Sequence, residues 1–230
     1  IIDDLTYGGR SISKPDPALQ PIIKINENEF ILAPSIFLSS SMERNLIVLV
    51  NRIPDSQYKF AYSSVVDEKE NFMREKIKYD LKELEFRFFN GKFPPSTMLP
   101  DIDLAIISDK EKFVLFLELK WFIEPSEPRE IIEKSQELQK GICQLKQLRE
   151  AYYQKPELFS ALKVDSNFEI FFAVASQNSI GRDKVQDGDI PVIKVEHLIK
   201  TIKQEKQLRK VSQWLYAREY LPKLNIDYKI

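Results

Sequence analysis

The hydrophobic positions between residues 67 and 89 recur at helical spacing. Asp67, with Glu70 three positions later, has the form of a helix start. Apolar side chains then follow at intervals of three and four, at Phe72, Met73, Ile77, Leu81, Leu84 and Phe88. Because such spacing places apolar groups on one face of a helix, the pattern predicts a helix over 67–89.

The pattern then changes to short, uninterrupted apolar runs. Residues 102–107 and 113–122 form two such runs, separated by the polar segment 108–111. Runs of this length bounded by polar turns are typical of buried strands. We therefore expect an antiparallel strand pair here.

Helical and extended patterns continue to alternate in the second half of the chain. Pro128, which suits a first helical turn, begins a periodic segment that predicts a helix over 128–154. Apolar runs predict strands at 168–175 and 190–195, and a basic helical tail follows from 194 to about 221. This order indicates an α/β fold with a mixed central β-sheet and helices on both faces.

The first 65 residues follow a different pattern. Glycines and prolines make residues 1–21 an irregular lead-in. The runs 22–25 and 30–33 predict a hairpin, and 42–53 predicts a short apolar helix that ends before Pro54. Since domains average about 150 residues, we expect an N-terminal support subdomain at 1–65 and a main domain at 66–230.

Composition narrows the class of protein. Of the 230 residues, 43% are hydrophobic and the formal net charge is −1, which excludes a disordered or collagen-like chain. The longest apolar runs are too short to span a bilayer. The single cysteine favours a reducing, cytoplasmic setting. The chain begins without methionine, so we expect processing or a longer parent protein with further domains.

Several kinds of catalytic site are excluded by counts alone. The six glycines form neither a dinucleotide-binding GxGxxG nor a P-loop. The only histidine, His197, follows an apolar run and is interpreted as structural. Cys143 lies within the predicted long helix and is interpreted as a small core residue. A Cys/His metal cluster therefore cannot be assembled. Any Ser-His or Cys-His triad would need His197, and no serine lies in a GxSxG motif.

One pair of charged residues stands out against an apolar strand. Glu118 and Lys120 project from the same face of the run 113–122, two positions apart. The [DE]xK pattern also occurs at 67/69, 80/82 and 227/229, but only this copy lies within a run of hydrophobics. Burying both charges costs on the order of several kcal/mol unless something offsets it. A metal ion and a polyanionic substrate would offset that cost. Asp103, fifteen residues upstream, is on the neighbouring predicted strand.

These residues resemble the signature of the PD-(D/E)xK nuclease superfamily. Pro100-Asp101 followed by Glu118-Leu119-Lys120 reproduces it, over roughly 67–199, with the order helix, hairpin, helix, strand. The resemblance implies a restriction-endonuclease-like core and a metal-dependent endonuclease that leaves 5′-phosphate and 3′-hydroxyl ends. It also implies that Glu118 binds Mg²⁺, with Mn²⁺ as a substitute, and that Lys120 assists the attack of water.

The remaining site residues are assigned on the same resemblance. Asp103 is favoured as the second metal ligand because apolar strand residues flank it, and Asp101 is the alternative. Family members often carry a further acid on the preceding helix, where Glu75 is preferred over Glu70 and Glu83. On the following helix, Gln144-Leu145 resembles a pair found near the catalytic lysine, although a solvated helix glutamine would look the same.

The expected partner is nucleic acid, DNA in preference to RNA. A net charge of −1 gives no overall attraction, so binding needs local patches. Residues 191–223 hold eight Lys or Arg against three Glu, interleaved with Trp214, Tyr216 and Tyr220, although an ordinary amphipathic helix has the same pattern. A site-specific enzyme would be a homodimer. The alternatives to a nuclease are a catalytically inactive module of the same fold, which binds nucleic acid or protein, and a plain α/β scaffold.

Overall fold

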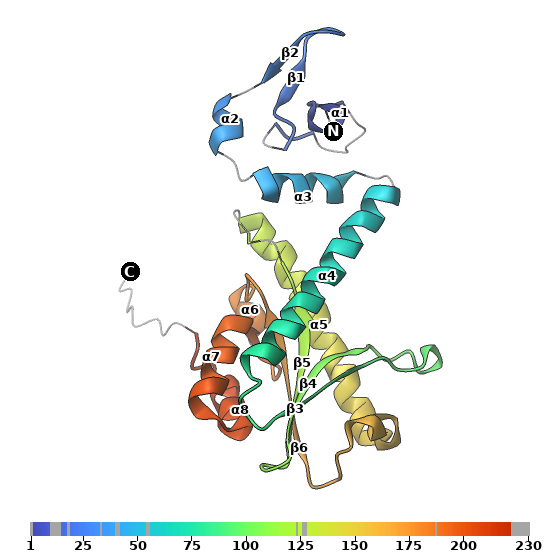
Figure 1. Cartoon of the computed structure of the whole chain (residues 1–230), viewed down its shortest axis with the longest axis vertical. Coiled ribbons are helices and arrows are strands. Elements are labelled where there is room, and N and C mark those ends of the chain that lie inside the picture. The colour runs from blue at the N-terminus through green and yellow to red at the C-terminus, as the bar shows by residue number, and fades with distance from the viewer. Residues whose placement is uncertain are drawn as a thin grey trace. The chain divides into compact units, whose positions relative to one another are not determined.

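The computed structural model describes residues 2–9, 15–17, 19–32, 34–39, 42–53, 56–122, 124–125, 128–186 and 188–221. The chain separates into two compact units, Ile1–Lys69 and Glu70–Ile230, with the division four residues beyond the expected 65/66 boundary. Figure 1 labels most of the helices and strands of both units. Each unit is described by itself below.

The first unit contains short elements around a small core. Its elements are α1 (Ile2–Leu5), β1 (Ile22–Lys24), β2 (Phe30–Leu32), α2 (Pro34–Ser39), α3 (Met42–Arg52) and the first part of α4 (Ser56–Asp80). The expected hairpin is present, since β1 and β2 pair antiparallel. The helix expected at 42–53 is also confirmed by α3. Buried side chains of Leu19, Leu49 and Ile53 form the core.

The second unit is built around a five-stranded mixed sheet. Its elements after α4 are β3 (Arg87–Gly91), the 3-10 helix η1 (Pro95–Thr97), β4 (Ile102–Ser108), β5 (Phe113–Lys120), α5 (Pro128–Gln154), the 3-10 helix η2 (Pro156–Leu162), β6 (Glu169–Ser176), α6 (Asp183–Gln186), β7 (Val192–Lys194), α7 (Val195–Glu205) and α8 (Leu208–Tyr216). The strand order is β3-β4-β5-β6-β7. The pairs β3/β4 and β4/β5 are antiparallel, whereas β5/β6 and β6/β7 are parallel.

Alternation along the strands divides the core between the two faces of the sheet. Leu104, Leu115 and Leu117 pack with apolar side chains of α4, α7 and α8. Ala105 and Phe116, one position away in each strand, pack with the apolar side of α5 and with η2. Figure 1 shows α7 and α8 on the opposite side of the sheet from α5. The expected mixed sheet flanked by helices is therefore confirmed, as are the strand pair β4/β5 and the helix at 128–154.

The prediction of one helix over 67–89 is wrong at both ends. Helix α4 begins at Ser56 and ends at Asp80, and residues 87–91 form β3 instead. Phe88 packs on the α4 side of the sheet and Phe89 on the α5 side, which is the alternation of a strand. Pairing with β4 therefore outweighs the helical spacing of Leu84 and Phe88.

The predicted basic helical tail consists of two helices, α7 and α8. Lys206 adopts a left-handed conformation with φ 54° and ends α7, and its N–H donates to the Ile202 carbonyl. Helix α8 then begins beside the carboxylate of Glu111, which accepts the N–H groups of Leu208 at 2.8 Å and Arg209 at 3.0 Å. A distant side chain therefore caps α8, which sequence spacing does not reveal.

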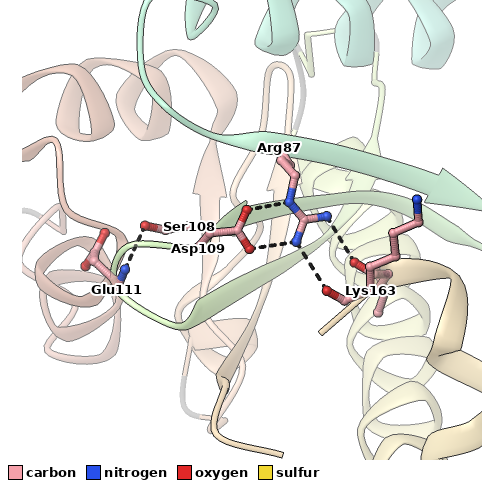
Figure 2. A network of polar contacts seen from close by, with 6 residues as sticks. Arg87, Ser108, Asp109, Glu111 and Lys163 are labelled. Atoms are coloured by element: carbon pink, nitrogen blue, oxygen red, sulfur yellow. Dashed lines mark hydrogen bonds and ion pairs between the residues drawn. The ribbon is translucent and has the colours of Figure 1, made fainter. Parts of the chain in front are cut away.

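Arg87 of β3 joins three segments at the end of the sheet that lies far from Lys120. Its guanidinium makes two bonds to the Asp109 carboxylate, at 2.6 and 2.8 Å, and donates to the carbonyls of Leu162 at 3.1 Å and Lys163 at 3.5 Å. Figure 2 shows this network. The hydrogen bond to Asp109 raises the pKa of Arg87 and lowers that of Asp109. Arg87 thus fixes the end of η2 against the β4–β5 turn.

Candidate active site

Asp103 and Glu118 lie opposite each other on β4 and β5. The register pairs Leu104 with Leu117, so one further step places Asp103 across from Glu118. Opposite residues of an antiparallel pair project from the same face. The Asp103 carboxylate also accepts the backbone N–H of Leu119 at 2.8 Å. The strand pair therefore brings together two acids that are fifteen residues apart in sequence.

Lys120 lies beside Glu118 on the same face. Its Nζ is 2.7 Å from Glu118 Oε1 and 3.3 Å from Gln144 Oε1 of α5. The Glu118 side chain is buried, at 4% exposed, while that of Lys120 is 20% exposed. Gln144 thus contacts the lysine directly, and the ammonium is held between a strand carboxylate and a helix amide.

Gly141 allows α5 to lie close to this pair. A Cβ at this position would stand 3.2 Å from both Glu118 Cγ and Lys120 Cε. A glycine inside a helix costs about 1 kcal/mol relative to alanine, so its presence there needs a packing reason. Sequence reasoning did not single out Gly141, although a glycine in the middle of a long predicted helix was the available signal.

Helix α4 adds two groups at the other side of Asp103. Arg74 donates to the Asp103 backbone carbonyl at 3.3 Å and also bonds Asn71. The charge of Glu70 contributes to raising the pKa of both Glu118 and Lys120. Glu70 is therefore electrostatically coupled to the site, and Arg74 is a neighbour that sequence reasoning missed.

The acid preferred from sequence, Glu75, is directed elsewhere. Its carboxylate pairs with Lys78 at 2.8 Å, and Lys78 in turn donates to Asn90 at 3.1 Å. Glu83 is exposed in the turn that follows α4. Of the three competing acids, only Glu70 has a resolved electrostatic effect on Glu118. The contact of Glu75 with Lys78 and the effect of the Glu70 charge on Glu118 thus favour Glu70 over Glu75 as the additional acid.

Asp101, the alternative to Asp103, faces solvent. Its side chain is 47% exposed, and Lys92 Nζ lies 3.9 Å from its carboxylate. The negative charge of Asp101 contributes to raising the pKa of Asp103, so the two acids are neighbours. Asp103 faces Glu118, whereas Asp101 lies at the rim.

Burial disfavours the ionised forms of the Asp103 and Glu118 carboxylates. Burial raises the pKa of Glu118 to about 7, with a further contribution from the negative charge of Asp103, while Lys120 opposes the shift. Burial also raises the pKa of Asp103 against the Leu119 N–H and the charges of Lys120 and Arg74. Burial by itself lowers the pKa of Lys120, but Glu118, Glu70 and Asp103 together raise it. The site therefore favours an added positive charge.

The donor set suits a partly hydrated divalent ion. In the described ranges, no group of three or more Asp, Glu, His or Cys side chains is arranged to hold a metal ion. Mg²⁺ is commonly bound by one or two carboxylates, with water and substrate phosphate oxygens completing its six positions. Asp103 and Glu118 supply two carboxylates whose anionic forms lack a sufficient counter-charge, so the residues present fit this mode of binding.

Other residues singled out in the sequence lie away from this site or have structural partners. Cys143 is exposed on α5, so its interpretation as a core residue is wrong. His197 is exposed on α7. Trp214 and Tyr220 contact each other, with ring centroids 5.3 Å apart, and both pack against the core. These two rings are therefore core elements more than stacking surfaces for bases.

Much of the basic tail is engaged in the fold. Arg209 pairs with Glu169 at 2.5 Å, and Lys203 lies 3.5 Å from Asp80. Arg218 donates to the carbonyls of Leu215 and Tyr216, each at 3.0 Å. Lys200, Lys206 and Lys210 are exposed, and Lys223 lies outside the described residues. The basic surface of this tail is thus smaller than its composition indicates.

Comparison of the chain with models of known protein families, with curated proteins and with solved structures gives no match. Within the described part of the chain, no helix combines the length and apolar character that crossing a bilayer requires. The geometry of the site is therefore the evidence that bears on function.

Proposed function

We propose that this chain is a metal-dependent nuclease that hydrolyses phosphodiester bonds of nucleic acid, with DNA as the preferred substrate. The arrangement of Asp103 opposite Glu118, with the Lys120 ammonium 2.7 Å from Glu118, is the observation that supports this function most directly. Two acids and a lysine at one end of a strand pair, in surroundings that favour added cations, suit a polyanionic substrate bound through divalent metal.

The order of elements supports the same proposal. The resemblance implies the order helix, strand pair, helix, strand, and the chain has α4, β4/β5, α5 and β6 in that order, with β3 added before the pair. A restriction-endonuclease-like core is part of the proposal. So are action as an endonuclease, a cytoplasmic location and, for a site-specific enzyme, a dimer.

The proposed roles follow from the contacts of each residue. Asp103 and Glu118 would hold Mg²⁺ or Mn²⁺, with Glu70, whose charge acts on Glu118, as an additional acid. The metal ion would supply an activated water molecule and neutralise charge on the phosphate. Lys120, with its ammonium 2.7 Å from Glu118 and 3.3 Å from Gln144, would assist the attack of water by donating hydrogen bonds and positive charge. Gln144 and Gly141 position its side chain.

The test is incubation of the full chain with plasmid, single-stranded DNA and RNA, each in Mg²⁺, Mn²⁺ or EDTA. The proposal predicts cleavage with metal and none with EDTA, and the preferred substrate identifies the nucleic acid class. DNA binding that does not need metal, without cleavage in any condition, would contradict the proposed nuclease activity. The alternative, a catalytically inactive module that binds nucleic acid, would then explain the result.

A further inference from the structure

A cavity lies at the opposite end of β5 and β6 from Lys120. Its volume is about 600 Å³, within the range of small-ligand sites. Its walls come from the end of α5, from η2, from the loop before β6 and from the first residues of β6. Lys120 is the last residue of β5, whereas Phe113, the first residue of that strand, lines the cavity. The cavity is thus separate from the acid pair by the length of a strand.

Three aromatic rings in the wall of this cavity contact one another in pairs. The ring of Tyr152 is 5.9 Å from that of Tyr153, with an interplanar angle of 88°, and 5.2 Å from that of Phe159, at 67°. All three residues line the cavity. Both contacts are edge-to-face, and Phe159 is a core ring only 3% exposed, whereas Tyr153 is 70% exposed. The aromatic surface open to a ligand is therefore mainly that of Tyr153, and the face of such a ring attracts alkylated ammonium groups.

The charged groups of the lining have the complementary sign. The lining contains the carboxylates of Asp165 and Glu169, and no Lys, Arg or His of the described residues lines it. Arg209 neutralises Glu169, whereas the Asp165 carboxylate accepts the backbone N–H of Asn167 in its own turn, at 2.9 Å. An anionic ligand would meet the Asp165 charge, whereas a cation would be stabilised by it.

A lysine of this chain already uses one of the lining rings in this way. Lys112 Nζ lies 4.9 Å from the centre of the Phe168 ring. The Arg87 contacts to the carbonyls of Leu162 and Lys163 hold the chain that leads into the Val164–Phe168 part of the wall (Figure 2). The wall is therefore tied to the sheet before any ligand binds, which lowers the ordering cost of binding.

We propose that this cavity binds an alkylated ammonium group, with Tyr152 and Tyr153 beside the cation and Asp165 as its counter-charge. Such a group occurs both in small molecules and in methylated lysine side chains, and the shared chemistry is a cation with an apolar surface. This ligand class differs from the phosphodiester of the proposed reaction, so the inference does not depend on nuclease activity.

Choline and 3,3-dimethylbutan-1-ol provide a matched pair of probes, because they have the same shape and differ in charge. Titration of the full chain, followed by calorimetry and by the NMR signals of the tyrosine rings, is expected to show saturable choline binding about tenfold tighter than binding of the alcohol. Equal affinities, or no saturable binding of choline, would overturn the proposal.

Variants locate the site. Tyr153→Ala is expected to weaken choline binding several-fold, Tyr153→Phe to preserve it, and Asp165→Asn to weaken it. Tyr216→Ala is the matched control, because Tyr216 is 66% exposed on α8 and Tyr153 is 70% exposed at the cavity. Circular dichroism verifies that each variant is folded. Choline affinity that is unchanged in both Tyr153→Ala and Asp165→Asn would overturn the assignment to this cavity.

The affinity of a peptide with one trimethyl-lysine distinguishes the two sources of the ammonium group, a small molecule and a methylated lysine side chain. Binding tighter than that of choline identifies a modified protein, while binding equal to or weaker than that of choline identifies a small molecule, and either result supports the ammonium site. An unmethylated peptide that binds as tightly as the trimethylated one, together with the alcohol as tightly as choline, would contradict it.

Discussion

The carboxylate of Asp103 on β4 accepts a hydrogen bond from the backbone N–H of Leu119 on β5, at 2.8 Å. This bond fixes one acid of the candidate site to the strand that carries the other acid. An asparagine could accept the same bond without the negative charge, so the structural role of Asp103 and its proposed role in metal binding can be separated by experiment.

Asp103→Asn is expected to lower cleavage at least a hundredfold while leaving thermal stability nearly unchanged or slightly raised, because it removes a buried charge and retains an acceptor. Asp103→Ala removes both, and loss of the bond to Leu119 is expected to lower the free energy of unfolding by about 1 kcal/mol. Denaturant unfolding and a cleavage assay measure the two effects. Equal stability losses in both variants would argue against the structural role of the bond.

Gly141→Ala tests the close approach of α5 to the site. The added Cβ would stand 3.2 Å from Glu118 Cγ and from Lys120 Cε, so one of these side chains must move. We expect cleavage to fall at least tenfold, although alanine favours the helix by about 1 kcal/mol. Gln139→Ala, an exposed position on the same helix, is the control. Full activity of Gly141→Ala would show that the approach is not required.

Glu118 makes the stability of the metal-free protein depend on pH. Its pKa is about 7 in the folded chain against an ordinary 4.5, so the folded state binds more protons between these values. The contribution of Glu118 to the free energy of unfolding therefore falls as the pH rises from about 4.5 to 7, and it stays low at higher pH.

Thermal unfolding in EDTA at pH 5 and pH 8 measures this dependence. We expect the melting temperature to fall between these values, at about 2–4 °C for each kcal/mol lost, and to fall less in Glu118→Gln. Mg²⁺ should restore stability at pH 8 in the parent chain and not in the variant. An equally steep fall in Glu118→Gln would assign the pH dependence to other groups.

Glu70 and Glu75 give opposite predictions on one helix. Glu70→Gln removes a charge coupled to Glu118, and it is expected to weaken Mn²⁺ binding several-fold. Glu75→Gln removes a partner of Lys78, and it is expected to leave Mn²⁺ affinity within about twofold, since exposed ion pairs contribute little. Calorimetric titration with Mn²⁺ measures both. A larger effect of Glu75→Gln would restore the choice made from sequence.

The parts of the fold that the sequence predicts are those governed by local periodicity. Helix α5 is found at its predicted bounds because Pro128 suits its first turn and its apolar positions are regular. The start of α4 at Ser56 was missed because Asp67 and Glu70 have the form of a helix start, whereas the helix runs through both of them. Strand β3 was missed because only two residues, Phe88 and Phe89, show the alternation between the two faces of the sheet. The strand also depends on pairing with β4, which the sequence does not reveal.

The same distinction applies to the candidate site. Asp103, Glu118 and Lys120 were identifiable because charges within apolar strands are unusual at any position. The roles of Gly141, Arg74 and Glu70 depend on how α4 and α5 are rotated against the sheet, which is a property of tertiary packing. Cys143 was misassigned for the same reason, since a shift of one position around α5 separates buried Ile142 from an exposed side chain.

The central claim is that Lys120 participates in metal-dependent cleavage of nucleic acid. The most direct measurement compares the rates at which the parent chain, Lys120→Ala and Lys140→Ala cleave the preferred substrate at saturating Mg²⁺. Lys140 lies on α5 in an exposed pair with Glu137 and controls for the loss of one positive charge. We predict a loss of at least a hundredfold in Lys120→Ala and a rate within twofold of the parent in Lys140→Ala. Equal rates for all three proteins, or no cleavage by the parent, would contradict the account.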